Sequence, residues 1–343
     1  MKYIGMDAHS RTCTFVVLTK SGKVLGKTTV ETREDKLLGF VKSVKGPKNL
    51  AYEEGVMSQW LYLLFKDEVD ELVVCQPQEK KGAKTDELDA TEIADLLRVG
   101  RLKSVFHADN VLMNLRITVS GYDDVVQELV RAKNRYKALF RQVAIPTGAT
   151  GFYESKQILL SLKGDERFYV ACTLFEQIAL LEQQRGGYVE RFEANARKYK
   201  AIKLLMSIPS IGPVRANQIV AILVTPYRFA KKYNLFSYAM LTKHNRISDG
   251  KLYGKQRALG HAELKRVFKS AALSAIKSDN AFRRKYDEMM AAGKDDRAAR
   301  HAVAKKIAAT VLGVWKSGKK YNDKHKEVTR RRNRIAIAEL ENL

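Results

Sequence analysis

Tyr3-Ile4-Gly5-Met6-Asp7 is an apolar run that ends in a carboxylate, and it predicts a buried β-strand. Two further strand-like runs, 12–18 and 24–30, flank Lys20-Ser21-Gly22-Lys23, a sequence typical of a hairpin turn. Beyond this hairpin the patterns alternate, with helices expected over 33–44, 58–65 and 86–99 and strands over 50–53 and 71–75. A hairpin followed by this alternation predicts an α/β domain whose sheet has mixed strand directions.

A different, all-α architecture begins after residue 108. Apolar residues recur every three or four positions over 112–143 and 174–199, and Ile145-Pro146-Thr147-Gly148 separates the two runs. These repeats predict a helical hairpin of coiled-coil type, with two core helices of a larger bundle as the alternative. Helical patterns continue from 201, and residues 316–343 hold nine Lys or Arg against four acids. We therefore expect four parts: 1–108, 109–200, 201–315 and a basic tail, 316–343.

The charge balance indicates a polyanionic partner. Lys and Arg total 62 against 38 Asp and Glu, which leaves a net charge of +24. No apolar run is long enough to cross a bilayer, and charged residues interrupt the N-terminal stretch, so we expect neither a membrane partner nor a secretory signal. The three cysteines are scattered, which suits a reducing cytoplasm and neither a zinc site nor a disulfide framework.

Four carboxylates in the α/β part could together hold metal ions. Asp7 and Glu53 each end an expected strand, and Asp86 and Asp89 share one face of an expected helix. Each has an ordinary explanation by itself, as a turn cap, a solvated acidic turn or a helix N-terminal charge. A basic protein that gathers four carboxylates can neutralise them with divalent cations, and hard oxygen ligands suit Mg²⁺ or Mn²⁺. Two such ions about 4 Å apart can assist displacement at a phosphodiester.

These residues resemble a known family. The strand-end Asp7, the Glu53-Glu54-Gly55 turn and the block Lys84-Thr85-Asp86-Glu87-Leu88-Asp89-Ala90 are similar to the DEDD transposases of insertion sequences. The resemblance implies a RuvC-like N-terminal domain of the RNase H superfamily, with Asp7, Glu53, Asp86 and Asp89 on its four metal-binding positions. Because strand side chains alternate between faces, Glu53 and Glu54 cannot both point toward Asp7, and Glu54 is the substitute ligand.

The third part opens with a turn that could contact DNA. Ile208-Pro209-Ser210-Ile211-Gly212 leads into an expected helix and is typical of a helix-hairpin-helix motif. Its glycine lets backbone N–H groups approach a phosphate, and Arg215 lies close by, so we expect both residues to bind DNA. A plain turn between two helices is the alternative.

A polar segment farther along contains a candidate nucleophile, Ser248. Four cations surround it in the sequence: Lys243, Arg246, Lys251 and Arg257. They could bind nucleic acid and stabilise charge on the phosphoryl oxygens while Ser248 attacks. A serine that only caps a turn is the alternative. His244 could serve as its general base, although a surface or phosphate-contacting histidine is the simpler interpretation.

The same family, bridge-RNA-guided recombinases, continues with a transposase domain in which a Leu-Thr-Pro…Ser-Gly loop carries a serine nucleophile. Leu241-Thr242 matches the start of that loop and Ser248 matches the nucleophile, while Lys243 replaces the proline and Asp249-Gly250 replaces Ser-Gly. The resemblance implies a DNA recombinase that works through a 5′-phosphoserine intermediate assisted by Mg²⁺. It also implies donor and target DNA, a structured noncoding guide RNA, a dimer to tetramer joined through coiled coils, and a prokaryotic cytoplasm where the protein associates with the nucleoid.

Two other functions remain open from the residues. A junction-resolving nuclease that uses water would need the four acids but not Ser248. A noncatalytic nucleic-acid-binding protein would need neither the acids nor the serine.

Overall fold

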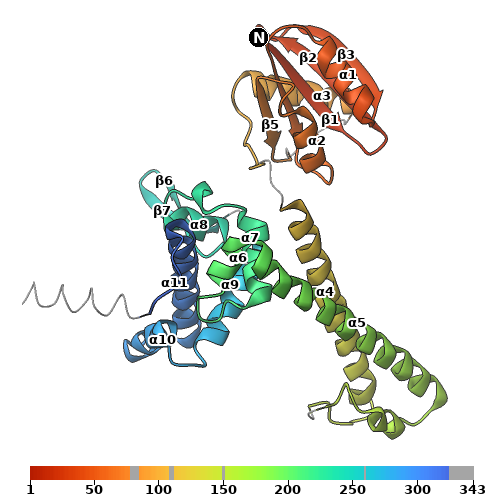
Figure 1. Cartoon of the computed structure of the whole chain (residues 1–343), viewed down its shortest axis with the longest axis vertical. Coiled ribbons are helices and arrows are strands. Elements are labelled where there is room, and N and C mark those ends of the chain that lie inside the picture. The colour runs from red at the N-terminus through yellow and green to blue at the C-terminus, as the bar shows by residue number, and fades with distance from the viewer. Residues whose placement is uncertain (78–84, 108–111, 149–150, 259, 324–343) are drawn as a thin grey trace, which may run out of the picture. The chain divides into compact units, whose positions relative to one another are not determined.

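The chain forms two compact units, Met1–Asn110 and Val111–Leu343, which are described separately (Figure 1). The computed structural model describes residues 1–77, 85–107, 112–148, 151–258 and 260–323, and for Met113, Lys255 and Arg257 it describes the backbone alone. The boundary expected between 108 and 109 lies outside these residues, as does most of the basic tail. Within the described part of the chain, no helix is long and apolar enough to span a membrane.

The first unit is built on a five-stranded sheet in the order β3-β2-β1-β4-β5. Its strands are β1 (Lys2–Ala8), β2 (Thr12–Thr19), β3 (Val24–Glu31), β4 (Lys48–Glu53) and β5 (Glu71–Cys75). β1, β2 and β3 pair antiparallel, whereas β1, β4 and β5 pair parallel. The five expected strands and the mixed strand directions are therefore confirmed.

Helices cover both faces of this sheet. α1 (Glu34–Ser43) and α2 (Ser58–Phe65) pack on one face, where Leu37 and Phe65 join Ile4 of β1 in a buried cluster. α3 (Asp86–Arg98) packs on the other face through Ala90 and Ala94. Strand side chains alternate between faces, so the neighbours of Ile4 in β1 face α3. One of them is Gly5, and only glycine fits there, because a Cβ atom would overlap the Ala90 carbonyl oxygen.

Two long helices open the second unit, as the repeats predict. α4 (Met113–Arg141) and α5 (Asp165–Lys198) pack against each other, with a short 3₁₀ helix, η1 (Lys156–Ser161), between them in the chain. Their far halves share a core that includes Tyr136 and Ile178. Leu115 near the start of α4 and Phe192 near the end of α5 belong instead to the core of the C-terminal helices. The hairpin is therefore continuous with the C-terminal helices at its base.

The C-terminal helices surround one large apolar core. They are α6 (Lys200–Leu205), α7 (Pro213–Leu223), η2 (Pro226–Arg228), α8 (Lys232–Tyr238), α9 (Ala262–Ala275), α10 (Ala281–Ala291) and α11 (Asp296–Ser317). Between α8 and α9 the chain forms a two-stranded antiparallel hairpin, β6 (Lys243–Ser248) and β7 (Lys251–Arg257). The mixed α/β N-terminal part and the helical C-terminal part agree with the expected fold class.

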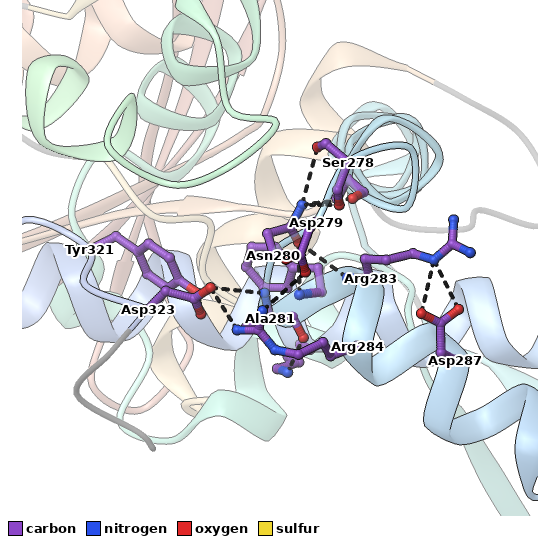
Figure 2. Close-up of polar contacts among 12 residues, drawn as sticks. Ser278, Asp279, Asn280, Ala281, Arg283, Arg284, Asp287, Tyr321 and Asp323 are labelled. Carbon is purple, nitrogen blue, oxygen red and sulfur yellow. Dashed lines mark hydrogen bonds and ion pairs between the residues drawn. The ribbon is translucent and has the colours of Figure 1, made fainter. Parts of the chain in front are cut away.

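The start of the expected basic tail is folded. α11 continues to Ser317, and the following residues dock on the N-terminus of α10 (Figure 2). The Asp323 carboxylate accepts hydrogen bonds from the backbone nitrogen of Ala281 at 3.1 Å and from Arg284 at 2.7 Å. The Tyr321 ring stacks on Phe282 with 5.9 Å between centroids. Among the residues expected to form the tail, Tyr321 and Asp323 therefore contact the helical unit.

Candidate active site

The parallel register of β1 and β4 brings two carboxylates to one edge of the sheet. Met6 pairs with Tyr52, so the next residues along the two strands, Asp7 and Glu53, are neighbours at the carboxyl ends of these strands. Since strand positions alternate between faces, both lie on the face of Gly5, which α3 covers.

The first turn of α3 adds two more carboxylates on the same face. Asp86 and Asp89 precede Ala90 and Ile93, which pack on the sheet, and helical periodicity puts all four on one side of α3. The Thr85 side chain caps the helix by accepting a hydrogen bond from the backbone nitrogen of Leu88 at 3.2 Å. The first turn of α3, which carries Asp86 and Asp89, therefore lies at the carboxyl ends of β1 and β4.

The pKa of Asp7 agrees with the closeness of Asp86 and Asp89. The pKa of Asp7 is raised, chiefly because burial disfavours its charged form and also because the charges of Asp86 and Asp89 repel it, while His9 acts in the opposite direction. Carboxylates brought together in this way are a hard-oxygen donor set, which fits Mg²⁺ or Mn²⁺. Asp7 and Asp86 are thus brought together, Asp89 is near enough for its charge to act on Asp7, and Glu53 ends the neighbouring strand.

The structure adds His9, which the sequence analysis did not single out as a ligand. Its Nε2 atom lies 3.1 Å from Oδ2 of Asp7 and 3.7 Å from Oδ1 of Asp86. Donor atoms of these three residues all lie within 4.8 Å of one another, close enough to bind one ion. The available sequence signal was the Asp-x-His spacing at the end of a strand.

Glu54 lies apart from this cluster. Its carboxylate is 3.2 Å from Nε2 of His107, whose side chain is only 4% exposed. The His107 ring in turn lies 5.5 Å from that of Tyr62 in α2, the helix that covers the opposite face of the sheet. This arrangement favours Glu53 over Glu54 as the strand-end ligand.

Ser248 lies at the tip of the β6–β7 hairpin and is exposed. The sequence predicts a loop here, but Asp249 and Gly250 have φ values of 49° and 69°, and positive φ at both central residues is typical of a tight type I′ hairpin turn. Lys251 pairs directly with Ser248 across the turn. Arg246 shares the strand face of Ser248 and donates a 3.1 Å hydrogen bond to Gln256. The Arg257 side chain lies outside the described residues.

His244 is not positioned to deprotonate Ser248. Its Nε2 atom forms a 2.7 Å hydrogen bond with Oγ of Ser237 in α8. Four residues along a strand span about 13 Å, so its ring lies far from Ser248. The simpler interpretation of His244, outside the chemistry, agrees with this geometry.

Arg215, in the first turn of α7, makes contacts that differ from the DNA contact expected for it from the sequence. Its guanidinium donates to the Ser210 carbonyl at 2.7 Å, to the Ser270 carbonyl at 3.2 Å and to Oγ of Ser274 at 3.0 Å. These bonds leave it little capacity for a DNA phosphate, so its contacts favour a structural role. Gly212 is the N-cap of α7, with open space around it, and remains a candidate for contact with DNA.

Comparison with known families now accounts for both units. A family model described as "Transposase" matches residues 4–145, and one described as "Transposase IS116/IS110/IS902 family" matches residues 202–287. The first match includes the five strands of the sheet except for the first two residues of β1, and the second includes the β6–β7 hairpin. No curated protein matches the chain significantly. Transposases of this kind cut and rejoin DNA, and the DEDD type uses divalent metal ions. The chain belongs to the IS110-type transposase family.

Proposed function

We propose that the protein is an RNA-guided, site-specific DNA recombinase that moves an insertion sequence through a 5′-phosphoserine intermediate. The observation that carries this proposal is the convergence of Asp7 and Asp86, with Asp89 on the same face of α3 and Glu53 at the end of the strand beside Asp7. The sheet, with its hairpin followed by parallel strands, supports a RuvC-like fold of the RNase H superfamily.

In this proposal the carboxylates hold Mg²⁺, with Mn²⁺ as an alternative, and His9 adds a nitrogen ligand. When bound, such ions supply Lewis-acid stabilisation of the attacking and leaving oxygens. Asp7 is anchored by its strand, and Asp86 and Asp89 by the capped first turn of α3, so their oxygens are positioned in advance. Glu53 completes the set from the neighbouring strand.

Ser248 supplies the nucleophile. Its Oγ attacks the phosphorus, the P–O3′ bond breaks, and the 3′ oxygen leaves with a proton as a hydroxyl. Lys251, paired with Ser248 across the turn, and Arg246 on the same strand face lie where they can stabilise charge on the phosphoryl oxygens. A 3′ hydroxyl of another strand then attacks the serine-linked phosphorus and releases Ser248. Each step exchanges one phosphodiester for another, so no ATP is consumed.

The proposal also includes an assembly. We infer that α4 and α5 join protomers as coiled coils into a dimer to tetramer, and that the 1–108 part of one protomer works with the 201–315 part of another. Support comes from apolar side chains left in solvent on these two helices, including Ile117 at 65%, Val130 at 53% and Leu180 at 54% exposure. A structured noncoding RNA would select donor and target DNA by base pairing, in a prokaryotic cytoplasm at the nucleoid.

The test uses full-length protein with Mg²⁺, a plasmid that carries the insertion sequence with its flanking DNA, and RNA transcribed from that flank. Denaturing gels should show a covalent protein–DNA adduct that Ser248→Ala abolishes and Ser237→Ala retains. Asp86→Asn should abolish both cleavage and adduct, whereas Asp35→Asn, in an exposed ion pair with Arg33, should leave both unchanged.

Three outcomes would overturn the proposal. Cleavage without any adduct would indicate a nuclease that uses water. Adduct formation that survives Ser248→Ala would place the nucleophile elsewhere. DNA binding without strand breakage, unaffected by Asp86→Asn, would indicate a noncatalytic binding protein. Omitting the RNA tests guidance separately, since joining at the correct site should then fail.

A further inference from the structure

A cavity of about 880 Å³ lies within the second unit and carries a large excess of positive charge. It is bounded by the start of β6, by α9 and by the first half of α11. Six lysines or arginines line it, against one acidic residue, Asp295. We name as the basic groove five of these, Lys243, Lys265, Lys269, Arg297 and Lys305, together with His301; the sixth, Arg300, is paired with Asp296.

Helical periodicity brings these side chains to the groove. They repeat at four-residue intervals on both helices, Lys265 and Lys269 on α9, and Arg297, His301 and Lys305 on α11. Residues four apart share one face of a helix, so each helix presents a row of basic groups. The adjoining faces of the helices are packed in the core through Phe268 of α9 and Ile307 of α11. The two rows are therefore held on a rigid support.

The effect on His301 shows that these charges converge. Burial lowers the pKa of His301, and the positive charges of Lys305, Lys269 and Lys265 lower it further. Like charges gathered in one cavity repel each other, which favours binding of an anion that neutralises them. Asp295, whose carboxylate caps α11 by accepting a 2.9 Å hydrogen bond from the backbone nitrogen of Ala298, offsets only one of these charges.

The position of the groove indicates which anion it binds. Lys243, in its wall, begins the strand that ends at Ser248. The five residue-to-residue steps from Lys243 to Ser248 span roughly 17 Å, and each strand of DNA carries a phosphate about every 3.4 Å along its axis. DNA engaged at Ser248 therefore has phosphates a few nucleotides away that can reach the groove.

We propose that the basic groove binds the phosphate backbone of the DNA that flanks the linkage attacked by Ser248. This proposal rests on the proposed function, because it takes Ser248 as the nucleophile. Four of the groove's five Lys and Arg side chains are lysines, point charges without the planar fork that reads base edges, so the groove positions the DNA and does not select its sequence.

The experiment measures binding of the full-length protein to a fluorescent DNA duplex of arbitrary sequence, by anisotropy, over a series of salt concentrations. The test variant is Lys265→Gln with Lys269→Gln. The matched control, Lys277→Gln with Lys294→Gln, removes two exposed lysines of the same unit that do not line the groove. The test variant should bind about tenfold more weakly near 0.15 M salt, and its log–log salt slope should fall by about 2. The control should stay within about twofold of the parent.

Equal affinities of the test and control variants would overturn the proposal. A duplex RNA of the same length is the second arm, and a loss confined to RNA would assign the groove to RNA instead. If the α9 variant fails to fold, as judged by its thermal unfolding curve, Arg297→Gln with Lys305→Gln repeats the test from α11.

Ser248→Ala separates the two proposals. It should bind the duplex with the affinity of the parent while forming no adduct. If the groove proposal is wrong, the groove variants bind DNA like the parent and still form adduct, so the proposal for Ser248 is unaffected. Failure of the serine chemistry would appear as adduct in Ser248→Ala, and it would not alter the measured affinities of the groove variants.

Discussion

Gly5 of β1 and Ala90 of α3 lie so close together that a Cβ atom on the glycine would overlap the Ala90 carbonyl oxygen and come within 2.5 Å of the backbone nitrogen of Ala94. This close approach of helix and sheet brings the first turn of α3, with Asp86 and Asp89, down to the ends of β1 and β4. The geometry of the proposed metal site therefore depends on a residue that has no side chain.

Gly5→Ala should displace α3 and weaken the metal site. Because the added methyl group meets backbone atoms, the helix must move, and overpacking of this kind costs about 1–3 kcal/mol of stability. Mn²⁺ affinity, measured by calorimetry, should fall at least tenfold. Gly39→Ala in α1, where nothing lies within 4 Å, is the control and should leave affinity unchanged while stability stays equal or rises slightly. Parent-like Mn²⁺ binding by Gly5→Ala would contradict this account.

His9→Ala should change metal preference as well as affinity. Imidazole nitrogen is a better ligand for Mn²⁺ and softer ions than for Mg²⁺, so the loss of Mn²⁺ affinity, expected to be about tenfold, should exceed the loss for Mg²⁺. Mn²⁺ EPR titration of the purified protein measures the Mn²⁺ affinity, and competition by the EPR-silent Mg²⁺ gives the Mg²⁺ affinity. His244→Ala, which removes a histidine bonded to Ser237, is the control. An equal loss for both metals would remove His9 from the ligand set.

Arg215→Gln should lower stability rather than DNA affinity. The substitution leaves the Ser210 and Ser270 carbonyls without their donor, at a cost of about 2 kcal/mol in urea unfolding. The salt slope of DNA binding should match that of the parent. Arg266→Gln changes an exposed arginine paired with Glu263 and should cost less than about 0.5 kcal/mol. A stable Arg215→Gln protein with a reduced salt slope of DNA binding would instead show that Arg215 contacts a DNA phosphate.

Asp323→Asn should destabilise the second unit in a pH-dependent way. Burial acts to raise the pKa of Asp323, but hydrogen bonds from Tyr321 and Arg284 outweigh it, so the folded-state pKa is lowered. A carboxyl with a depressed pKa contributes stability that is fully present above its unfolded pKa, near 3.9, and is lost as the pH falls through its folded value.

The difference between parent and Asp323→Asn, about 1 kcal/mol in urea unfolding, should therefore be constant from pH 8 to pH 5 and shrink below pH 4. Asp279→Asn removes another partner of Arg284, but one whose side chain is 89% exposed, and should have almost no effect. A difference that grows with acid would show that the ionised Asp323 is not the stabilising form.

Periodic patterns in the sequence were enough to predict the strands and helices of the first unit. Alternation of side chains along strands also predicted that Glu53 and Glu54 face different ways, which the contact between Glu54 and His107 agrees with. Such arguments work because local spacing decides which face of an element a residue occupies. His9 was missed because its closeness to Asp86 arises only when α3 folds over the strand ends.

The role of Arg215 depended on partners far along the chain. Its hydrogen bonds to Ser270 and Ser274 of α9 join residues more than fifty positions apart, and no spacing rule indicates them. The groove lysines of α9 and α11 were hidden for the same reason, because each of these helices resembles an ordinary basic helix until the two are packed side by side.

Ser248 lies at the exposed tip of the β6–β7 hairpin in the second unit, while Asp7, Glu53, Asp86 and Asp89 belong to the first unit. In the proposed mechanism, neither unit cuts DNA by itself. Because the two units of one active site come from different protomers, an isolated protomer that meets chromosomal DNA is harmless. Chromosomal DNA would then be cut only when units from two protomers are assembled on the correct target site. A mobile element gains from this restraint, since its host survives to carry it.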